Sequence, residues 1–487
     1  MSNHRLIQTA SITLFIALLG LSGLITYTVR AGNGQWDRLG PEGGPIEVLD
    51  SLNPQVAHAG PLLPDDLDTT FNSTGIVTTS ISGLDDFAFS LAVQPDGKTV
   101  VAGLSDSDPS DATIRFDADV AVVRYEVDGS LDSSFNGTGI VTTTLGSGSG
   151  GGSQNAVAIQ PDGMIVVAAS INNDDSYNNS DFAVLRYLST GAPDLSFNGT
   201  GVVTTSISSR VDAVFDVAIQ PDGKIVVAGH INNSTDPMST DFDFALVRYD
   251  SGGSLDMTFN GTGIITTPIG NGDDFGVAMD ISPEGKIVLA GANYGDAPSG
   301  ECAVVRYNDN GSLDPEFNGT GIVTTPCDVG GVYNVAIQPD GKIVTVGFDF
   351  IMRYNNDGSQ DTSFNGTGVV TLPIIGEVVT IQPDNTIIVA GSLDLPDSAF
   401  AVARYLDNGT LDTSFNQAGI VTTSVGTLFD DFGSLAGFDS GEAVASLPDG
   451  NIVVAGYSYW NEQAEFTVLR YIGDPQPVAF LPVIVKG

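Results

Sequence analysis

The stretch Phe-Asn-Gly-Thr-Gly-Ile-Val-Thr-Thr, which returns seven times with small variations, constrains the fold of this chain more than any other feature. Its copies begin at Phe71, Phe135, Phe197, Phe259, Phe317, Phe364 and Phe415, at successive spacings of 64, 62, 62, 58, 47 and 51 residues. A module that recurs in this way indicates a repeat architecture, in which each copy is one supersecondary unit. We therefore expect an array of seven similar units.

One repeat, residues 197–259, contains four segments rich in the β-branched and aromatic residues that are typical of strands. These segments are residues 201–205, 216–220, 224–229 and 243–249. Between the second and the third, Pro221-Asp222-Gly223 forms a tight turn, because proline presets φ, aspartate bonds its own backbone and glycine allows a positive φ. Each unit is thus predicted to be four short antiparallel strands.

The proline-containing turn and an Arg-Tyr strand end also recur seven times. The turns start at Pro95, Pro161, Pro221, Pro283, Pro339, Pro383 and Pro448, and the strands end at Arg124, Arg186, Arg248, Arg306, Arg353, Arg404 and Arg470. A single four-stranded sheet cannot bury both of its faces, so the seven units must pack on one another. We predict an all-β fold, a closed seven-bladed β-propeller of four-stranded antiparallel blades, which leaves only short, protected edges.

The order of these landmarks predicts how the ring closes. The first landmark is the strand at residues 75–80, which has no preceding partner, and the last is the strand that ends at Tyr471. We predict that residues 75–80 complete the blade formed by residues 443–471. The blades then begin near Ser90, Asn155, Asp216, Val277, Asn334, Val378 and Ala443.

The charge balance excludes some classes of partner. The chain has 59 acidic and 17 basic residues, a formal net charge of −42. Such a field repels phosphate backbones and anionic lipid, so we expect no nucleic-acid partner and no membrane contact beyond the N-terminal segment. It suits solubility outside the cell and loose binding of cations.

The two ends of the chain differ from the repeats. Residues 1–31 hold an apolar run from Ile12 to Val29 and resemble an export signal peptide, with a retained N-terminal anchor as the alternative. Residues 32–66 are predicted to be a linker, and residues 67–472 the propeller. Residues 473–487 form an apolar tail, either packed on the fold or acting as an export or surface-retention tag. We expect an exported protein, extracellular or associated with the cell envelope.

With these motifs in view, the chain resembles the delta-60 repeat family of bacterial exported β-propeller-like proteins. The matching motifs, LDxSFNGTGxVTT, VAIQPDGKIVVAG and DFAVVRYxxDGSLD, cover about residues 67–471. Local departures are Ser282-Pro283-Glu284-Gly285, Pro383-Asp384-Asn385 and Asn416-Gln417-Ala418-Gly419. The resemblance implies a repeat fold and export but no chemistry. The VAIQPDGK hairpin also looks like the opening strands of WD40 propellers, which implies that its first strand lines the central channel and that GIVTT is outermost.

With that strand order, the loops that vary in length gather on one face, and such loops often bind ligands. Its acidic residues are candidate Ca²⁺ ligands, namely Asp85, Asp86, Asp174, Asp175, Asp241, Asp243, Asp273, Asp274, Asp430 and Asp431. Candidate ligand contacts on the same face are Tyr177, His230, Tyr294, Tyr459 and Trp460. The alternative is a solvated face with drifting loops.

The repeated Asp-Gly-Ser-Leu-Asp turn also suggests Ca²⁺, but an arginine occupies the position of the first ligand. Each arginine precedes an aspartate by eight residues, which predicts a structural ion pair in each turn. The pairs are Arg124–Asp132, Arg186–Asp194, Arg248–Asp256, Arg306–Asp314, Arg353–Asp361 and Arg404–Asp412. Arg470 has no such aspartate after it and is predicted to pair with Asp68 across the ring closure.

Enzyme motifs are scarce, because the chain has three histidines and neither a GxSxG elbow nor a paired-histidine metal motif. We therefore expect no cofactor other than Ca²⁺. The predicted function is a monomeric binding or surface-structural module for an unknown protein, glycan or envelope polymer. The alternative is a secreted carboxylate-based hydrolase or lyase acting on a glycan or similar polymer.

The two cysteines stand in consecutive predicted strands. Cys302 begins the strand that ends in Arg306, and Cys327 follows the strand at residues 321–326. If these strands pair antiparallel, the cysteines face each other, so we predict a Cys302–Cys327 disulfide.

Overall fold

The computed structural model describes residues 9–14, 25–32, 35–39, 66–106, 118–145, 155–173, 179–236, 239–295, 300–327, 330–395, 397–426, 439–460 and 463–473. The chain divides into two compact units, Met1–Gly60 and Pro61–Gly487. In the first unit, β1 (Thr9–Leu14), β2 (Ile25–Gly32) and β3 (Gln35–Leu39) form an antiparallel sheet in that order. Within the described ranges, no helix has the length and apolar character needed to cross a bilayer. The export signal, linker and tail stay predictions.

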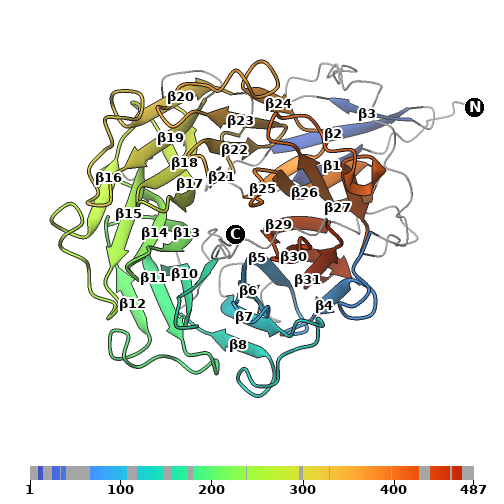
Figure 1. Cartoon of the computed structure of the whole chain (residues 1–487), viewed down its shortest axis with the longest axis horizontal. Coiled ribbons are helices and arrows are strands. Elements are labelled where there is room, and N and C mark those ends of the chain that lie inside the picture. The colour runs from blue at the N-terminus through green and yellow to red at the C-terminus, as the bar shows by residue number, and fades with distance from the viewer. Residues whose placement is uncertain are drawn as a thin grey trace, which may run out of the picture. The chain divides into compact units, whose positions relative to one another are not determined.

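The second unit consists of seven four-stranded antiparallel sheets, numbered here as blades in chain order (Figure 1). Blade 1 contains β5 (Asp86–Val93), β6 (Thr99–Ser105), β7 (Asp119–Tyr125) and β8 (Ile140–Thr143). Blade 2 contains β9 (Ala156–Ile159), β10 (Ile165–Asn172), β11 (Ser180–Tyr187) and β12 (Val202–Thr205). Blade 3 contains β13 (Asp212–Ile219), β14 (Ile225–Asn232), β15 (Phe242–Tyr249) and β16 (Ile264–Thr267). Blade 4 contains β17 (Asp274–Ile281), β18 (Ile287–Asn293), β19 (Glu301–Tyr307) and β20 (Ile322–Pro326).

The remaining blades follow the same pattern. Blade 5 contains β21 (Asn334–Ile337), β22 (Ile343–Gly347), β23 (Phe350–Tyr354) and β24 (Val369–Thr371). Blade 6 contains β25 (Ile375–Ile381), β26 (Ile387–Leu395), β27 (Asp397–Tyr405) and β28 (Ile420–Thr423), with the short 3₁₀ helix η1 (Phe415–Gln417) before β28. Blade 7 contains β29 (Asp439–Ser446), β30 (Ile452–Trp460), β31 (Gln463–Tyr471) and, from the other end of the unit, β4 (Ile76–Thr79).

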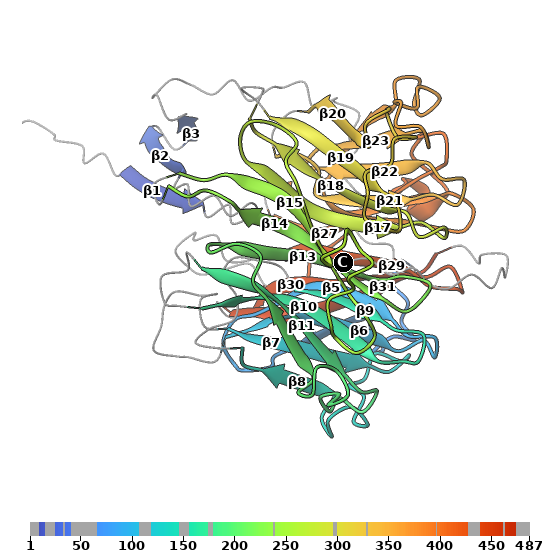
Figure 2. The same cartoon turned by 90° about the vertical axis from the view of Figure 1, so that its left-hand side faces the viewer.

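The seven blades form a closed ring, which confirms the predicted propeller. The first strand of each blade contacts the first strands of its two neighbours, and β29 contacts β5. In Figure 1 these first strands surround the centre, whereas the fourth strands lie at the rim. Figure 2 shows the strands from the side, running between the two faces of the ring. The predicted order, with the VAIQ-type strand innermost and GIVTT outermost, is therefore correct.

The predicted closure of the ring is also confirmed. β4 pairs antiparallel with β31, from Phe466 opposite Thr79 to Leu469 opposite Ile76. The Asp68 amide extends this pairing by donating a 2.8 Å hydrogen bond to the carbonyl of Arg470. One strand from one end of the unit and three from the other thus make one blade.

The core lies between neighbouring blades, because both faces of each sheet are covered. One cluster joins Val100 and Val122 of blade 1 to Val167 and Leu185 of blade 2, and six similar clusters continue around the ring. The inner strands therefore contain nearly continuous apolar runs instead of an alternating pattern.

The Phe-Asn-Gly-Thr-Gly motif builds the turn that leads to each rim strand. Its asparagine adopts a left-handed conformation, with φ of 51° at Asn136, a region that asparagine tolerates better than most residues. The Asn136 side chain donates a 2.8 Å hydrogen bond to the carbonyl of Ile140. These contacts explain why Asn-Gly recurs, and they give the asparagine of the motif a structural role.

The two cysteines form a disulfide across the outer strands of blade 4. Cys302 lies in β19 and Cys327 follows β20, which pairs antiparallel with β19. Their Cα atoms are 5.6 Å apart. The bond ties the start of β19 to the segment that leads into blade 5.

Candidate functional site at the inner ring

The antiparallel strand order gives the propeller two different faces. The face that holds the proline turns and the turns after each Arg-Tyr pair is named here the turn face. The opposite face, which holds the loops of unequal length, is named the variable face. Because strands alternate in direction, the first strand of each blade runs from the variable face to the turn face.

An arginine, an aspartate and a phenylalanine form the same buried contact at the turn face of every blade. Arg248 Nε lies 2.8 Å from Asp256 Oδ2, and its guanidinium carbon lies 4.4 Å from the centre of the Phe259 ring. The other six predicted pairs, including Arg470 with Asp68, are also within ion-pair distance. Each of these arginines also covers the phenylalanine of its repeat, at 4.5–4.8 Å.

These arginines also join neighbouring blades. Arg124 Nη1 donates to the carbonyl of Ser189 in the turn of the next blade, and Arg470 Nη1 donates to that of Val127. The paired aspartates have lowered pKa values. Burial opposes this shift, but hydrogen bonds from Thr258 and the charge of Arg248 hold the pKa of Asp256 at about 2. The arginine–aspartate contacts of the turn face, named here the clamps, therefore hold each turn and join it to the next blade.

A second contact joins six of the seven blades to the preceding one through the tyrosine of the Arg-Tyr pair. Tyr249 OH lies 2.7 Å from Thr205 Oγ1 of blade 2, and five other blades have the equivalent bond. The exception is Tyr405 of blade 6, whose threonine partner would come from blade 5. There Leu372 replaces the second threonine of the Val-Thr-Thr motif, and the buried hydroxyl of Tyr405 has no partner. The sequence variation thus explains the exception.

Among the residues that the structure describes, the variable face carries almost none of the positive charge. Among the described residues of the second unit, every lysine and every arginine except Arg210 lies in a turn-face contact or in a proline turn. Arg210 donates to the carbonyls of Asp236 and Ser239, both at 2.9 Å. Few described cations therefore offset the negative charge of the acidic residues on the variable face. The resulting negative potential favours neutral or cationic ligands over anionic ones.

Two of the predicted Ca²⁺ ligands, Asp86 and Asp274, are buried structural residues. The Asp274 carboxylate accepts hydrogen bonds of 2.7 Å and 3.2 Å from the amides of Ile269 and Gly270, and Asp86 accepts one of 2.7 Å from Ile81. They anchor the loop that enters the first strand of their blade. Sequence analysis missed that Asp212 and Asp439 do the same, although their equivalent position before the inner strand could have revealed it.

The other described acidic candidates also bond within the loops. Asp85 accepts from the Ala464 amide at 2.7 Å, and Asp273 accepts from the Phe242 amide at 3.1 Å and from Thr240 Oγ1 at 2.7 Å. Asp243 accepts from the Asn233 side chain, and Asp241 is exposed. No group of three acidic, histidine or cysteine side chains suited to a metal occurs among the residues that the structure describes. Asp174, Asp175, Asp430, Asp431, Tyr177 and the side chain of Trp460 lie outside them.

His230 was expected on an exposed loop, and this expectation is wrong. It lies in β14, is 1% exposed, and packs against the rings of Phe215, Phe242 and Phe275 at 4.9–5.2 Å. Burial lowers the pKa of His230 to about 4, so the imidazole is neutral near pH 7. The β14–β15 hairpin extends farther than the sequence pattern indicated, which draws His230 into the core.

The predicted ligand-contact tyrosines do not meet each other. Tyr294 packs edge-on against Phe275 of blade 4 at 5.8 Å. Tyr459 of blade 7 packs against Phe87 of blade 1 at 6.4 Å and lies beside Tyr457 at 6.3 Å. The described residues of the variable face thus form two separate aromatic clusters.

A site that the sequence did not reveal lies on the first strands of blades 5, 6 and 7. β25 and β29 each contain a β-bulge near the variable face, whose extra residue is Glu377 in β25 and Glu442 in β29. A glycine must stand opposite each bulge. A Cβ atom on Gly391 would lie 2.0 Å from the Ile375 carbonyl oxygen, and one on Gly456 would lie 1.8 Å from that of Ser440. The final glycine of the VVAG motif therefore permits the bulge that presents each glutamate.

The same position holds other residue types elsewhere in the ring. It is Phe89 in blade 1, Phe215 in blade 3 and Val277 in blade 4. By alignment of the Val-Ala-Ile-Gln motif, it is Asn155 in blade 2 and Tyr333 in blade 5. Three successive blades thus carry Tyr333, Glu377 and Glu442, whereas four carry apolar or amide side chains.

The two glutamates interact electrostatically. Burial and then the charge of Glu442 raise the pKa of Glu377 well above its ordinary value. Ser440 Oγ lies 2.7 Å from Glu442 Oε1 and donates to it. Burial, followed by the charge of Glu377, also raises the pKa of Tyr333. The site therefore combines two electrostatically coupled carboxyl groups, one of them hydrogen-bonded to Ser440, with a phenol.

The buried carboxylates of the variable face predict how stability depends on pH. Burial raises the pKa of Asp274 to about 6 and also raises those of Asp86, Asp212, Asp243, Asp439 and Glu465. A raised folded-state pKa gives stability that is complete below the unfolded pKa and is lost as pH rises through the folded value. For Asp274 this corresponds to a free energy of unfolding that is about 2–3 kcal/mol higher at pH 4 than at pH 7.

We therefore expect calorimetry to show a higher melting temperature at pH 5 than at pH 7.5. Below about pH 4 the trend should reverse, because the clamp aspartates, with Asp256 at about 2, lose stability as pH falls through their lowered pKa values. His230 has the opposite effect. Because its pKa is lowered to about 4 in the folded protein, the unfolded chain binds a proton there first, which lowers the melting temperature as pH falls. Asp274→Asn should reduce the rise, and a steady decline from pH 7.5 to pH 5 would contradict the assignment.

A family model supports the repeat architecture independently of the structure. The family described as "Domain of unknown function (DUF5122) beta-propeller" matches residues 94–135, 160–197, 220–259, 283–317, 338–364 and 382–415. Each match runs from the end of an inner strand to the phenylalanine of the next Phe-Asn turn. This chain is a β-propeller repeat protein. None of the curated proteins matches it.

Several solved structures match this chain at low sequence identity. A catalytically inactive virginiamycin B lyase from Staphylococcus aureus with quinupristin is 10% identical, with 81% of this chain and 98% of that chain covered and a TM-score of 0.44. A protein of unknown function from Dyadobacter fermentans is 12% identical, with 82% and 99% covered and a TM-score of 0.42. An ulvan lyase bound to a sugar fragment is 10% identical, with 82% and 96% covered and a TM-score of 0.44. At these values the likeness carries no argument about function.

Proposed function

We propose that this protein is an exported, monomeric β-propeller that binds a neutral or cationic ligand, such as a glycan, on its variable face at the inner ring. The observation that carries the proposal is the placement of Tyr333, Glu377 and Glu442 at equivalent positions of three successive blades, whose inner strands are neighbours in the ring. The charges of these groups also influence one another. Two carboxyl groups and a phenol together offer both donors and acceptors to hydroxyl or amino groups. Export, the resemblance to the delta-60 repeat family and loose binding of Ca²⁺ by the acidic face belong to the same proposal.

The charge distribution supports the ligand class. Arg210 is the one described cation of the variable face, and its Nη1 already donates to two loop carbonyls. A uronic-acid or sulfated ligand would therefore meet an acidic surface with few positive groups, whereas an amino sugar would be attracted to it.

The test measures binding of neutral, amino-sugar and uronic-acid oligosaccharides by calorimetry, with Ca²⁺ and with chelator. We expect the double variant Glu377→Gln/Glu442→Gln to weaken amino-sugar binding about 10–100-fold, because hydrogen bonds to charged groups contribute about 1.5–3 kcal/mol. Glu284→Gln removes the same charge from an exposed position of the turn face and is the matched control. Equal binding of all three sugar classes, or no effect of the double variant, would overturn the proposal.

A second candidate function is a carboxylate-based hydrolase or lyase, and the electrostatic coupling of the two glutamates favours it. Paired carboxyl groups whose pKa values are pushed apart can act as general acid and general base. Glu377 would be the acid and Glu442, held by Ser440, the base or nucleophile. This function requires turnover with a bell-shaped pH profile that either single Gln variant abolishes while binding persists. Binding without turnover would leave the first proposal.

A further inference from the structure

A glutamine at the end of the inner strand joins neighbouring blades on the turn face. Gln220 Oε1 of blade 3 accepts from Arg248 Nη1 at 3.0 Å. Its Nε2 donates to the blade 4 turn, at 3.4 Å to the Gly285 carbonyl and 2.8 Å to Asp309 Oδ1. In blade 5, Gln338 bridges Arg353 to the Asn385 carbonyl and Asp407 in the same way, and in blade 2 Gln160 bridges Arg186 to the Gly223 carbonyl.

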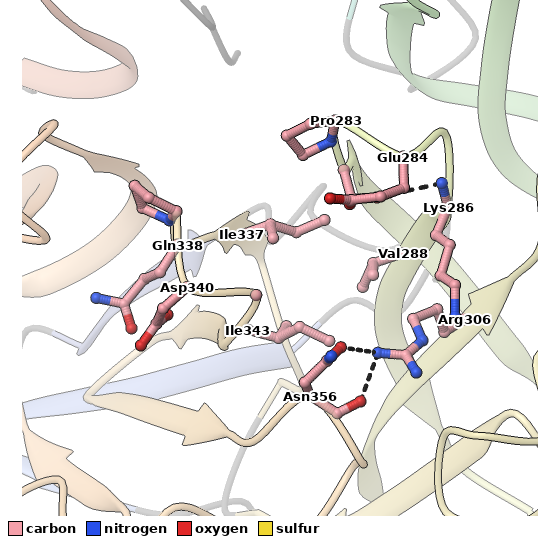
Figure 3. A pocket seen from close by; sticks show the side chains of 13 residues that line it. Pro283, Glu284, Lys286, Val288, Arg306, Ile337, Gln338, Asp340, Ile343 and Asn356 are labelled. Atoms are coloured by element: carbon pink, nitrogen blue, oxygen red, sulfur yellow. Dashed lines mark hydrogen bonds between the residues drawn. The ribbon is translucent and has the colours of Figure 1, made fainter. Parts of the chain in front are cut away.

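Blade 4 lacks this glutamine. Ser282 takes its place in the motif Ser-Pro-Glu-Gly, and its hydroxyl accepts a 3.2 Å hydrogen bond from the Lys286 amide instead of reaching blade 5. A cavity of about 380 Å³ lies at this position between blades 4 and 5. Figure 3 shows Arg306 and Asn356 facing each other at its floor, with Ile337 and Val288 along its walls. The cavity therefore occupies the space that a carboxamide side chain fills in neighbouring blades.

The groups that bind the carboxamide elsewhere are still present around this cavity. Arg306 Nη1 lies 2.6 Å from both the carbonyl oxygen and Oδ1 of Asn356, the residue equivalent to Asp309 and Asp407. Gly341, which lines the cavity, holds the turn position whose carbonyl accepts from the glutamine in blades 2 and 3. A donor, a side-chain acceptor and a backbone acceptor thus converge on a space with apolar walls.

We propose that this cavity is a binding site for a primary carboxamide. Its oxygen accepts from Arg306, and its NH₂ group donates to the Gly341 carbonyl and to Asn356 Oδ1. A carboxylate of the same shape has no donor, so it would face two acceptor oxygens and the nearby Glu284 and Asp340. Lys286 also lines the cavity, but its amine is already paired with Asp314 at 2.8 Å and Glu316 at 3.1 Å. The carboxamide can come from a free small amide or from an asparagine or glutamine side chain of a peptide partner.

The test measures the melting temperature and NMR spectra of the full chain during titration with propionamide, and with propionate as the charged counterpart. We expect a saturable rise with propionamide and a response at least about tenfold weaker with propionate, one missing hydrogen bond being worth about tenfold. Ser282→Gln fills the cavity and should abolish the response, while Ser282→Ala keeps it. Gln220→Ser should open a second site and double the amount bound at saturation.

A peptide ligand and the comparison between variants show where the carboxamide comes from and whether the site exists. If acetyl-Ala-Gln-Ala-N-methylamide binds more tightly than propionamide, the site is assigned to a peptide partner. If the two bind equally, the site is assigned to free amides. Both outcomes support a carboxamide site. A wild-type response equal to that of Ser282→Gln, or equal responses to propionamide and propionate, would overturn it. The site is on the face opposite Glu377 and Glu442, so failure here leaves the proposed function untouched.

Discussion

Arg248→Met is expected to lower the free energy of unfolding by about 3–5 kcal/mol, the cost of leaving one partner of a buried ion pair unpaired. The Arg248 side chain is 1% exposed, and its removal leaves the Asp256 carboxylate without its main partner. The substitution also removes donors to the Gln220 side chain and to the Asp309 carbonyl of the next blade. Urea unfolding followed by circular dichroism measures the change.

Two further variants test whether the buried, multiply bonded guanidinium or only a positive charge stabilises this contact. Lys224 Nζ lies 3.3 Å from the same carboxylate but is partly exposed, so Lys224→Met should cost less than about 1 kcal/mol. Arg248→Lys keeps the charge but loses the planar fork that bonds several acceptors at once, so it should recover little of the lost stability. Similar losses for Arg248→Met and Lys224→Met would show that the contact is an ordinary surface pair.

Deleting residues 66–80 is expected to abolish the cooperative unfolding of the propeller. Without β4, the edge of β31 has no partner, and the interface that buries Phe71 and Val77 between blades 7 and 1 is incomplete. Arg470 also loses Asp68, with which it makes a 2.8 Å ion pair. We expect exposed apolar surface and aggregation, measured by dye binding and size-exclusion chromatography, because an unpaired strand edge recruits other chains.

A circular permutant provides the matched rescue. It consists of residues 81–473, an Asp-Gly insertion and then residues 66–80, which sets Arg470 and Asp68 eight residues apart as in the other six pairs. We expect it to fold with cooperative unfolding close to that of the natural chain, because the closing blade becomes continuous without a change in contacts. Folding of the deletion variant, or failure of the permutant, would contradict closure by β4.

Features set by short spacings could be predicted from the sequence. Arg353 and Asp361 are eight residues apart across one turn, so the turn alone brings them together. The Cys302–Cys327 pair follows from the pairing of two consecutive strands. Ring closure also followed from order alone, since a lone strand at one end and a three-stranded unit at the other complete one blade.

Burial could not be predicted in this way, because it depends on the neighbouring blade. Asp274 was predicted only as a candidate Ca²⁺ ligand of the variable face, and the structure shows that it is 0% exposed and holds the loop before β17. His230 was expected on a loop, yet three phenylalanine rings from adjacent strands and the next blade enclose it. The sequence pattern marks these residues as polar but carries no information on what packs against them.

The sequence by itself determined the number of blades, the four strands of each, the closure of the ring and the arginine clamps, because each of these depends on a local, repeated pattern. Only the tertiary structure decided which residues meet at the inner ring. Tyr333, Glu377 and Glu442 belong to three different repeats, and the curvature of the ring brings their inner strands together. The Ser282 cavity has the same origin, since its walls come from two blades and its volume depends on a side chain that one of them lacks.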